Sequence, residues 1–457
     1  MFRKTMRRAT ILALVLVFAL CFSAYAADSS DLLNVLPGEP GDTLTRSEFG
    51  AMLVKAANLQ PAEKSVPLPG DVKAEAWYAS SMQTLLSTGI LRGFGDGTVK
   101  PDQPISQAEA VAMVARTLGL PQEVPAREAN QLPITGNHWA FNNYSWMVSE
   151  GLLTRVDAQK VLTPEEGADL LTHVFGTAEK CKEITDKMEA ANQSITSTRM
   201  SGEMDMQMNM RQVGDNRDMP SSVSTTVYMD AELVMDQGLH MVMETFISAG
   251  ENLPAESITM EQYITRDGMF MSMQDPETKE ITWTRIPDTA FPNIMELLKQ
   301  QTNPLPEELK NMFHYRYLGE EKLAGQEVYK LAYYGEIKDL AKMIAALGQL
   351  GGGQLQQTLD QAQGMLQSIS YAGTMYVNKE TYLPVSASNY SIVTYAGEFQ
   401  GQPVPIDTMQ VCYEFSYSDY NAPMDIVVPQ EALNAEEFPL TAPEIESTET
   451  VQPAAEQ

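Results

Sequence analysis

The N-terminal third of this 457-residue chain starts a helix in the same way three times. Residues 45–48, 106–109 and 163–166 each place Ser or Thr three positions before Glu. In such a capping box the hydroxyl accepts a hydrogen bond from the backbone N–H three residues on, and the glutamate accepts one from the N–H of the capping residue. An apolar stripe with helical spacing follows each box. Because one helix pair cannot bury such a stripe alone, the three copies are predicted to pack together as an all-α bundle.

A second helix precedes the later copies of this box. When Trp77 is placed over Trp139, Gly89 falls on Gly151, with apolar residues at helical spacing between them. The full pattern of the middle copy reads Ala76-Trp77, Thr88-Gly89-Ile90, Gly93-Phe94-Gly95-Asp96-Gly97-Thr98, Pro101 and Ile105-Ser106-Gln107-Ala108-Glu109. This pattern resembles an S-layer homology (SLH) repeat along its whole length.

The resemblance extends over three segments. Residues 61–122 hold the complete repeat, residues 27–60 resemble the second half of another, and residues 131–178 resemble a third with a shortened middle loop. SLH modules typically occur in threes and bind secondary cell-wall polysaccharide. The resemblance therefore implies that partner, and a location at the cell wall or cell surface of a bacterium.

The resemblance also implies which residues contact the polysaccharide. In the family, an arginine just after the helix cap contacts an acidic group of the sugar. Only Arg46 matches it here, because Gln107 and Pro164 occupy the equivalent positions. At most one fully equipped groove is therefore expected. The candidate contacts are Arg46, Trp77, Asp96 and Trp139.

Each candidate also has a structural interpretation. Trp77 and Trp139 are expected as buried core residues rather than exposed sugar platforms, since large aromatic side chains are mostly buried. Asp96 lies between two glycines and is interpreted first as a turn former. Arg46 is either a ligand contact or a solvated surface residue. The capping glutamates are interpreted as structural.

Residues 1–26 have the pattern of a secretory signal peptide. Four basic residues precede an apolar run at 11–20, and Ala24-Tyr25-Ala26 matches a signal-peptidase site. The run is too short for a stable membrane anchor, and no later stretch is apolar enough to form a transmembrane segment. Lipid attachment at Cys21 is disfavoured because Phe18-Ala19-Leu20 holds a bulky residue where the motif requires a small one. A secreted protein is predicted.

The formal net charge of −29 excludes nucleic acid as a partner and disfavours unaided binding to anionic lipid. Removal of the basic signal segment makes the chain more acidic still. The mature chain keeps Cys181 and Cys412. Export permits one disulfide between them, but two such sparse cysteines are equally compatible with two inert buried thiols.

Beyond residue 180 the apolar period changes from that of a helix to that of a strand. The residues alternating with polar ones are Met204, Met206, Met208 and Met210. This two-residue period is typical of a half-buried strand. Similar segments recur to residue 417, so an α+β domain is predicted, with an antiparallel sheet and helices near 184–195, 337–350 and 355–366.

Two segments of this region, residues 318–331 and 376–384, resemble a LolA/LppX-type lipoprotein-carrier domain. The resemblance spans about residues 181–438. It implies a curved antiparallel sheet, a half-barrel that wraps helices and encloses an apolar cavity for a hydrophobic or lipid-like ligand. The candidate cavity residues are Met206, Met208, Met241 and Met271.

These methionines have two other interpretations. Ordinary core is the default. Clustered thioethers also bind Cu(I), but with no supporting cysteine and only His240 nearby, no metal is predicted. The acidic tail at 439–457 lacks an apolar period and is predicted to be disordered.

No catalytic motif is recognisable. The four histidines are scattered, and the HExxH, G-x-S-x-G and CxxC patterns are absent. The prediction is a non-catalytic, cofactor-free multidomain protein anchored non-covalently to the wall, with a C-terminal domain that binds a hydrophobic ligand or partner. The alternatives are an SLH-anchored hydrolase of unrecognised fold and a purely structural envelope protein.

Overall fold

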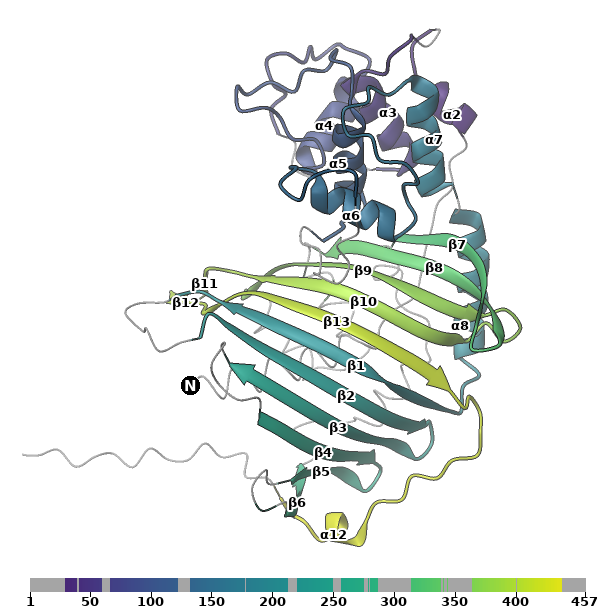
Figure 1. Ribbon diagram of the computed structural model, residues 1–457, viewed down its shortest axis with the longest axis vertical. Helices are drawn as coiled ribbons and strands as arrows, with labels where there is room; N and C mark the ends of the chain where they lie inside the picture. Colours follow the sequence, from purple (N-terminus) through teal and green to yellow (C-terminus); the bar gives the residue numbers. More distant parts are fainter. Residues whose placement is uncertain are drawn as a thin grey trace, which may run out of the picture.

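The fold is described from a computed structural model of the chain (Figure 1). The structure describes residues 29–38, 41–59, 66–121, 132–176, 178–212, 220–249, 256–274, 278, 280–286, 314–337, 340, 343, 364–399 and 401–437. The predicted signal peptide and the predicted acidic tail lie outside these residues.

The N-terminal part consists of short helices joined by loops (Figure 1). They are α2 (Ser29–Leu33), α3 (Arg46–Ala56), α4 (Ala79–Ser87), α5 (Gln107–Thr117), α6 (Phe141–Ser149) and α7 (Pro164–Phe175). Their apolar faces share one core, in which Phe49, Leu85 and Tyr144 are fully buried. The longer helix α8 (Ala178–Asn192) follows and leads into a sheet.

All three predicted capping boxes are present. Thr45, Ser106 and Thr163 each accept a hydrogen bond from the backbone N–H of the glutamate three residues on, and that glutamate accepts one from the N–H of the cap. Pro164 occupies the first position of α7. A missing N–H costs nothing there, because the first N–H groups of a helix have no intrahelical partner.

The residues just before the three caps are joined in a ring of backbone hydrogen bonds. The N–H of Leu44 donates to the carbonyl of Leu162, that of Leu162 to Ile105, and that of Ile105 to Leu44, at 2.8, 3.1 and 2.8 Å. All three side chains are buried. The three copies of the capping box therefore meet around one central ring.

The C-terminal part is dominated by one large sheet (Figure 1). Its strands are β1 (Ser197–Met210), β2 (Ser222–Val234), β3 (Gly238–Ala249), β4 (Glu256–Thr265), β5 (Gly268–Gln274), β6 (Ile281–Ile286), β7 (His314–Leu323), β8 (Gln326–Ile337), β9 (Leu366–Asn378), β10 (Pro384–Tyr395), β13 (Ile406–Ser418) and β14 (Glu436–Glu437). They lie in the order β14-β6-β5-β4-β3-β2-β1-β13-β10-β9-β8-β7. Among the described pairings of this sheet, β14 with β6 is parallel and the others are antiparallel. The short strands β11 (Glu398–Phe399) and β12 (Gln402–Pro403) form a separate pair.

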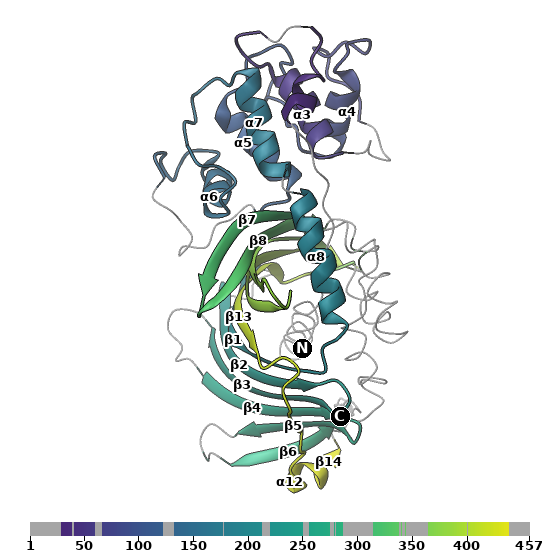
Figure 2. The same ribbon diagram turned by 90° about the vertical axis from the view of Figure 1, so that its right-hand side faces the viewer.

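The sheet curves around an apolar inner face, and α8 lies inside the curve (Figure 2). The two-residue period explains this face. Met204, Met206 and Met208 are buried in its core, while the residues between them are directed to the other side of β1. Helix α8 adds to the same core the side chains of Cys181, Ile184 and Met188.

On this inner face, two aromatic side chains pack directly against the backbone of a glycine in the neighbouring strand. A Cβ placed on Gly373 of β9 would be 2.6 Å from the hydroxyl of Tyr333 on β8, and one on Gly202 of β1 would be 2.5 Å from the ring of Phe415 on β13. The Tyr333 hydroxyl donates to the carbonyl of Ser388 at 2.8 Å. Glycine in a strand interior commonly marks such a close approach.

The helical part docks on the outer face of β7 to β10. Tyr334 and Tyr390 belong to the same apolar core as the N-terminal helices, and the ring of Trp146 on α6 packs 5.5 Å from that of Tyr390. Gly119, just after α5, adopts a φ of +67°, and a Cβ there would lie 2.3 Å from the backbone nitrogen of Glu336. The two parts therefore touch through backbone as well as side chains.

The C-terminal segment runs from the end of β13 past the ends of the neighbouring strands to the far end of the sheet (Figure 1), where it packs against β4, β5 and β6. Ala432 in the short helix α12 (Gln430–Leu433) is fully buried beside Tyr263 and Phe270. Strand β14 then pairs with Thr284 and Arg285 of β6, so this part of the sheet edge is covered.

The predicted order, helices followed by a large curved antiparallel sheet, is confirmed. The predicted helices at 337–350 and 355–366 lie mostly outside the described residues, and at their margins Ile337 and Leu366 belong to β8 and β9 instead. Cys181 and Cys412 are not joined by a disulfide. They pack on opposite faces of the sheet, which explains why the disulfide alternative fails.

Candidate functional site

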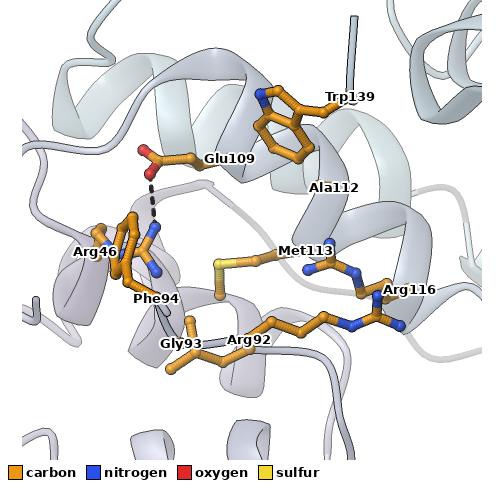
Figure 3. Close-up of a pocket in the computed structure, with 10 residues that line it drawn as sticks. Arg46, Arg92, Gly93, Phe94, Glu109, Ala112, Met113, Arg116 and Trp139 are labelled. Carbon is orange, nitrogen blue, oxygen red and sulfur yellow. Dashed lines mark hydrogen bonds and ion pairs between the residues drawn. The ribbon is translucent and has the colours of Figure 1, made fainter. Parts of the chain in front are cut away.

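A pocket of about 200 Å³ opens in the helical part, between the first and second copies of the capping box and beside Trp139 (Figure 3). Its walls come from α3, from the loop after α4, from α5 and from the residue before the α6 N-cap. The lining residues are Arg46, Leu91, Arg92, Gly93, Phe94, Glu109, Ala112, Met113, Arg116 and Trp139. The volume is several times the roughly 30 Å³ that one water occupies, which suits a small ring or acidic group.

Arg46 is the most firmly held of these residues. Its side chain is buried, with Nε donating to the carbonyl of Val99 at 2.9 Å and Nη1 to Oε1 of Glu109 at 2.8 Å. The guanidinium also lies 4.9 Å from the centre of the Phe94 ring. Burial lowers the pKa of Arg46, and the ion pair with Glu109 opposes part of this shift. The alternative of a solvated surface arginine is therefore wrong.

Glu109 has two functions at once. One carboxylate oxygen accepts from the backbone N–H of Ser106 at 2.9 Å and completes the capping box of α5. The other oxygen accepts from Arg46. The capping interpretation is confirmed for this glutamate, and the ion pair that fixes Arg46 is an addition to it.

Positive charge in the pocket exceeds negative charge. Glu109 balances Arg46, and among the ten lining residues no other carboxylate faces Arg92 or Arg116. Burial, followed by the charges of Arg92 and Arg46, lowers the pKa of Arg116 to about 10, so it stays protonated at neutral pH. In a protein with a net charge of −29, this pocket is locally suited to an anion.

The two candidate tryptophans differ in their position relative to the pocket. Trp139 lines the pocket and Trp77 does not. The expectation that both are core residues is wrong, because 44% of Trp77 and 61% of Trp139 are exposed. Both lie in the turns that precede α4 and α6, outside the apolar stripes of the helices, so packing does not bury them. An exposed indole beside guanidinium groups is a surface on which a sugar ring can stack.

Gln107, the residue equivalent to Arg46 in the next copy, makes its hydrogen bonds within the protein. Gln107 is buried, its Nε2 donates to the carbonyl of Arg155 at 3.1 Å, and its Oε1 accepts from the Asp157 N–H at 2.7 Å and the Tyr144 hydroxyl at 3.1 Å. The side chain at the second of these positions is thus fully engaged within the protein, and Pro164, at the third, has no polar side-chain atom to offer.

Asp96 forms the turn predicted for it. Its Oδ1 accepts from the backbone N–H of Thr98 at 3.0 Å and from the Thr98 hydroxyl at 2.6 Å, and these bonds lower the pKa of Asp96. Asp96 is exposed and is not among the residues that line the pocket.

The four candidate methionines share the inner face of the sheet. Met206, Met208 and Met241 are buried in its core, whereas Met271 on β5 is half-buried. Cross-strand pairing places Met241 opposite Gln262, and Gln262 opposite Met271. Farther along β5, Met273 is 41% exposed. The first three are buried, as either a core residue or a cavity residue would be, and the apolar side chains become accessible toward the β5 end.

Arg92, Phe94, Met113 and Arg116 were not among the sequence candidates. Arg92 and Phe94 lie in the Gly-rich loop of the SLH-like pattern, and Met113 and Arg116 lie three apart on one face of α5. That spacing was visible in the sequence. What the sequence does not contain is the packing that brings this face against α3 and against Trp139.

The comparisons with known proteins follow the same two parts. The family of unknown function DUF6612 matches residues 180–437, and the S-layer homology domain matches residues 70–111. The predicted resemblance to an SLH repeat is confirmed for those residues.

Two bacterial surface proteins are similar to this chain over short stretches. The middle cell wall protein of Brevibacillus brevis is 31% identical over 146 residues, which are 30% of this chain and 13% of that protein. The surface layer protein of Brevibacillus choshinensis is 34% identical over 80 residues, or 17% and 7% of the two chains. This chain therefore spans only a small part of the length of these relatives.

Among solved structures, the lipoprotein LppX of Mycobacterium tuberculosis covers 54% of this chain and 97% of its own at 11% identity, with a TM-score of 0.25. This is a protein of the type that the sequence resemblance names. A TM-score this low carries no functional argument.

Two further observations concern the described residues alone. None of their helices is long and apolar enough to cross a membrane. Nor do they contain a group of three or more His, Cys, Asp or Glu side chains arranged to hold a metal ion.

Proposed function

We propose that this chain, which belongs to the family of unknown function DUF6612, is held at the cell wall by its helical part and binds a hydrophobic ligand on its sheet. It is a protein of the cell-wall surface, as its SLH domain and its relatives indicate. In the proposal, the binding partner of the helical part is a wall polysaccharide that carries acidic groups.

The observation that carries the first half of the proposal is the excess of positive charge in the pocket beside an exposed indole. Arg46 is held rigid by Glu109, so it presents its guanidinium without further ordering. Arg92 and Arg116 supply charge that an acidic substituent of a sugar would balance. Trp139 supplies the flat apolar surface for the sugar ring.

Replacement of Trp139 by alanine is expected to weaken binding of purified wall polysaccharide by at least about tenfold, the loss that 1.4 kcal/mol corresponds to. Trp77→Ala is the matched control, because it removes another exposed tryptophan that does not line the pocket. Its binding is expected to stay within about twofold of wild type, since surface changes typically cost below 0.5 kcal/mol. Co-sedimentation with the polymer measures both variants.

The acidic group has a test of its own. Arg92→Ala is expected to reduce binding to intact polysaccharide and to reduce its dependence on salt concentration. Polysaccharide from which the acidic substituents have been removed should bind wild type and Arg92→Ala equally weakly. Equal losses for Trp77→Ala and Trp139→Ala, or undiminished binding to the neutralised polymer, would contradict the proposed site.

The second half of the proposal concerns the inner face of the sheet. Supporting it are the buried methionines of β1 and β3 and the partly exposed ones of β5. Met243, Met260 and Met273 form an unbroken cross-strand row, whereas Gln262 lies between Met241 and Met271. Methionine side chains are flexible and polarisable, so such a surface adapts to ligands of different shapes. The ligand class proposed is an acyl chain or another elongated hydrocarbon.

Met271→Glu is expected to abolish binding of a dansyl-labelled fatty acid, because a carboxylate on the accessible part of the inner face cannot be desolvated by the probe. Val242→Glu is the control: Val242 is 36% exposed on the outer face of β3 and should leave probe binding unchanged. Fluorescence titration of the full-length protein measures both. If both variants or neither lost the probe, the inner face would not be the binding surface.

In this proposal the protein is not an enzyme. The histidines are spread over separate places: His138 before α6, His173 on α7, His240 on β3 and His314 on β7. His240 bonds through Nε2 to Oε1 of Glu261 at 2.9 Å on the outer face, remote from the apolar face where the ligand is placed. A purely structural envelope role differs from the proposal by predicting no uptake of the acyl probe.

A further inference from the structure

The contact between the helical part and the sheet contains one buried cation. Arg316 of β7 is 4% exposed, and its Nη1 donates to the carbonyl of Gly151, just after α6, at 2.6 Å. Its Nη2 lies 3.1 Å from Nδ1 and 2.9 Å from Nε2 of His173 on α7. The same Nε2 lies 3.1 Å from the carbonyl of Gly151. One arginine of the sheet is thus inserted between two elements of the helical part.

A neutral His173 can make two of these contacts as hydrogen bonds at once, that of Nε2 with the Gly151 carbonyl and that of Nδ1 with Arg316. The approach of Nη2 to Nε2 is then a contact between two donors and not a hydrogen bond. A neutral imidazole with its proton on Nε2 donates to the Gly151 carbonyl and leaves Nδ1 free to accept from Arg316. A protonated imidazole has donors on both nitrogens and no acceptor. It would face the guanidinium with like charge and without a hydrogen bond, so the contact with Arg316 requires the neutral form.

The rest of the contact between the helical part and the sheet is not tightly satisfied. It contains apolar packing, with Trp146 against Tyr390, but also buried polar atoms without a hydrogen-bond partner among the described residues, namely Nε of Arg316 and the hydroxyl of Tyr334. Buried polar groups are normally satisfied, so each such atom weakens the docked state. Contacts of this mixed kind between domains of one chain commonly open and close.

We propose that His173 makes docking of the helical part on the sheet dependent on pH, with the docked arrangement held at neutral pH and released when His173 gains a proton. His173 is exposed at the rim of the contact, so protons reach it while Arg316 stays buried. The inference is independent of what either part binds. It gives an anchored protein a means to swing its sheet relative to the wall.

The direction of the pH dependence follows from the charged and titratable groups around His173. Partial burial, then the charge of Arg316, lowers the pKa of His173, while the bond with the Gly151 carbonyl opposes this. Arg316 in turn faces Tyr334 of β8 and the Cys181 thiol of α8, and Glu150 at the end of α6 faces Tyr334. Because the pKa of His173 is lower in the docked state than the usual value of about 6.5, docking is undisturbed above that value. It is lost progressively as the pH falls below it, by at most about tenfold in the docking equilibrium per pH unit.

Hydrogen exchange of the full-length protein at pH 7.5 and 5.5, corrected for the intrinsic exchange rate, tests the proposal. In wild type, peptides covering β7 and the end of α6 are expected to lose protection at pH 5.5, while β1 and β13 stay protected. In His173→Gln, which cannot gain a proton, protection of β7 should be the same at both pH values. His240→Gln removes a histidine of the sheet away from the contact and should behave as wild type.

Three outcomes would overturn the proposal. The first is a wild-type β7 that stays fully protected at pH 5.5, and the second is a His173→Gln variant that loses protection with the wild-type pH dependence. The third is simultaneous loss of protection in β1 and β13, which would mean global unfolding. Arg316→Gln provides a second measurement that does not depend on how well glutamine fits at position 173. It should exchange rapidly at β7 at both pH values, with β1 and β13 still protected.

Discussion

Replacement of Arg46 by alanine is expected to lower the free energy of unfolding of the helical part by about 3 to 5 kcal/mol and to abolish its binding to wall polysaccharide. The reason is the setting of the ion pair: the side chains of Arg46 and Glu109 are 5% and 18% exposed. Loss of the arginine leaves the carboxylate with the cost of its burial and without its partner, and leaves the Val99 carbonyl unpaired. Chemical denaturation followed by circular dichroism, and co-sedimentation with the polymer, measure the two effects.

Two variants separate stability from binding. Lys160→Ala breaks the ion pair with Glu166 in another copy of the capping box, where both side chains are more than a third exposed, and should cost less than about 1 kcal/mol. The double variant Arg46→Ala/Glu109→Gln should recover part of the lost stability, since glutamine still serves the cap, but none of the binding. If the double variant bound the polymer like wild type, Arg46 would not be part of the binding site.

Gly202→Val is expected to destabilise the sheet by about 3 kcal/mol or more, because β1 and β13 form the centre of the strand order. The first atom of any side chain at this position would lie 2.1 Å from the carbonyl oxygen of Glu414 and 2.5 Å from the ring of Phe415. Backbone of the neighbouring strand cannot rotate away as a flexible side chain can. The midpoint of urea denaturation measures the loss.

Ser201→Val provides the matched control one residue earlier on the same strand. Ser201 is exposed on the outer face, where a β-branched residue fits an extended backbone, so the change should stay within about 0.5 kcal/mol of wild type. Equal destabilisation by the two substitutions would mean that the close packing of Phe415 over Gly202 is unimportant.

Local patterns predicted the elements of this protein well. The capping boxes are local, since a hydroxyl and a carboxylate three residues apart meet whenever the helix forms, and all three are present. The alternation at Met204 to Met208 likewise follows from strand geometry alone. The curvature of the sheet came from the family resemblance and not from any such pattern.

Contacts between distant segments explain most of what was missed. Arg46 was left between ligand contact and solvated surface because its partners Val99 and Glu109 lie 53 and 63 residues away. Trp139 was expected in the core because aromatic residues usually are, yet it belongs to a turn that meets α5 only after the repeats assemble. The docking of Arg316 on Gly151 joins residues 165 apart, and Arg316 belongs to no motif that would have drawn attention to it.

The ring formed by Leu44, Ile105 and Leu162 constrains which copies of the repeat the helical part can lose during evolution. A linear array of repeats has two ends, and removal of a terminal unit leaves its neighbours intact. In this ring each copy donates to one of the others and accepts from the remaining one, so there is no terminal unit. Truncation at any copy opens the same circle. The copies are therefore free to diverge in their grooves, as Gln107 and Pro164 have done, but not to be lost one at a time.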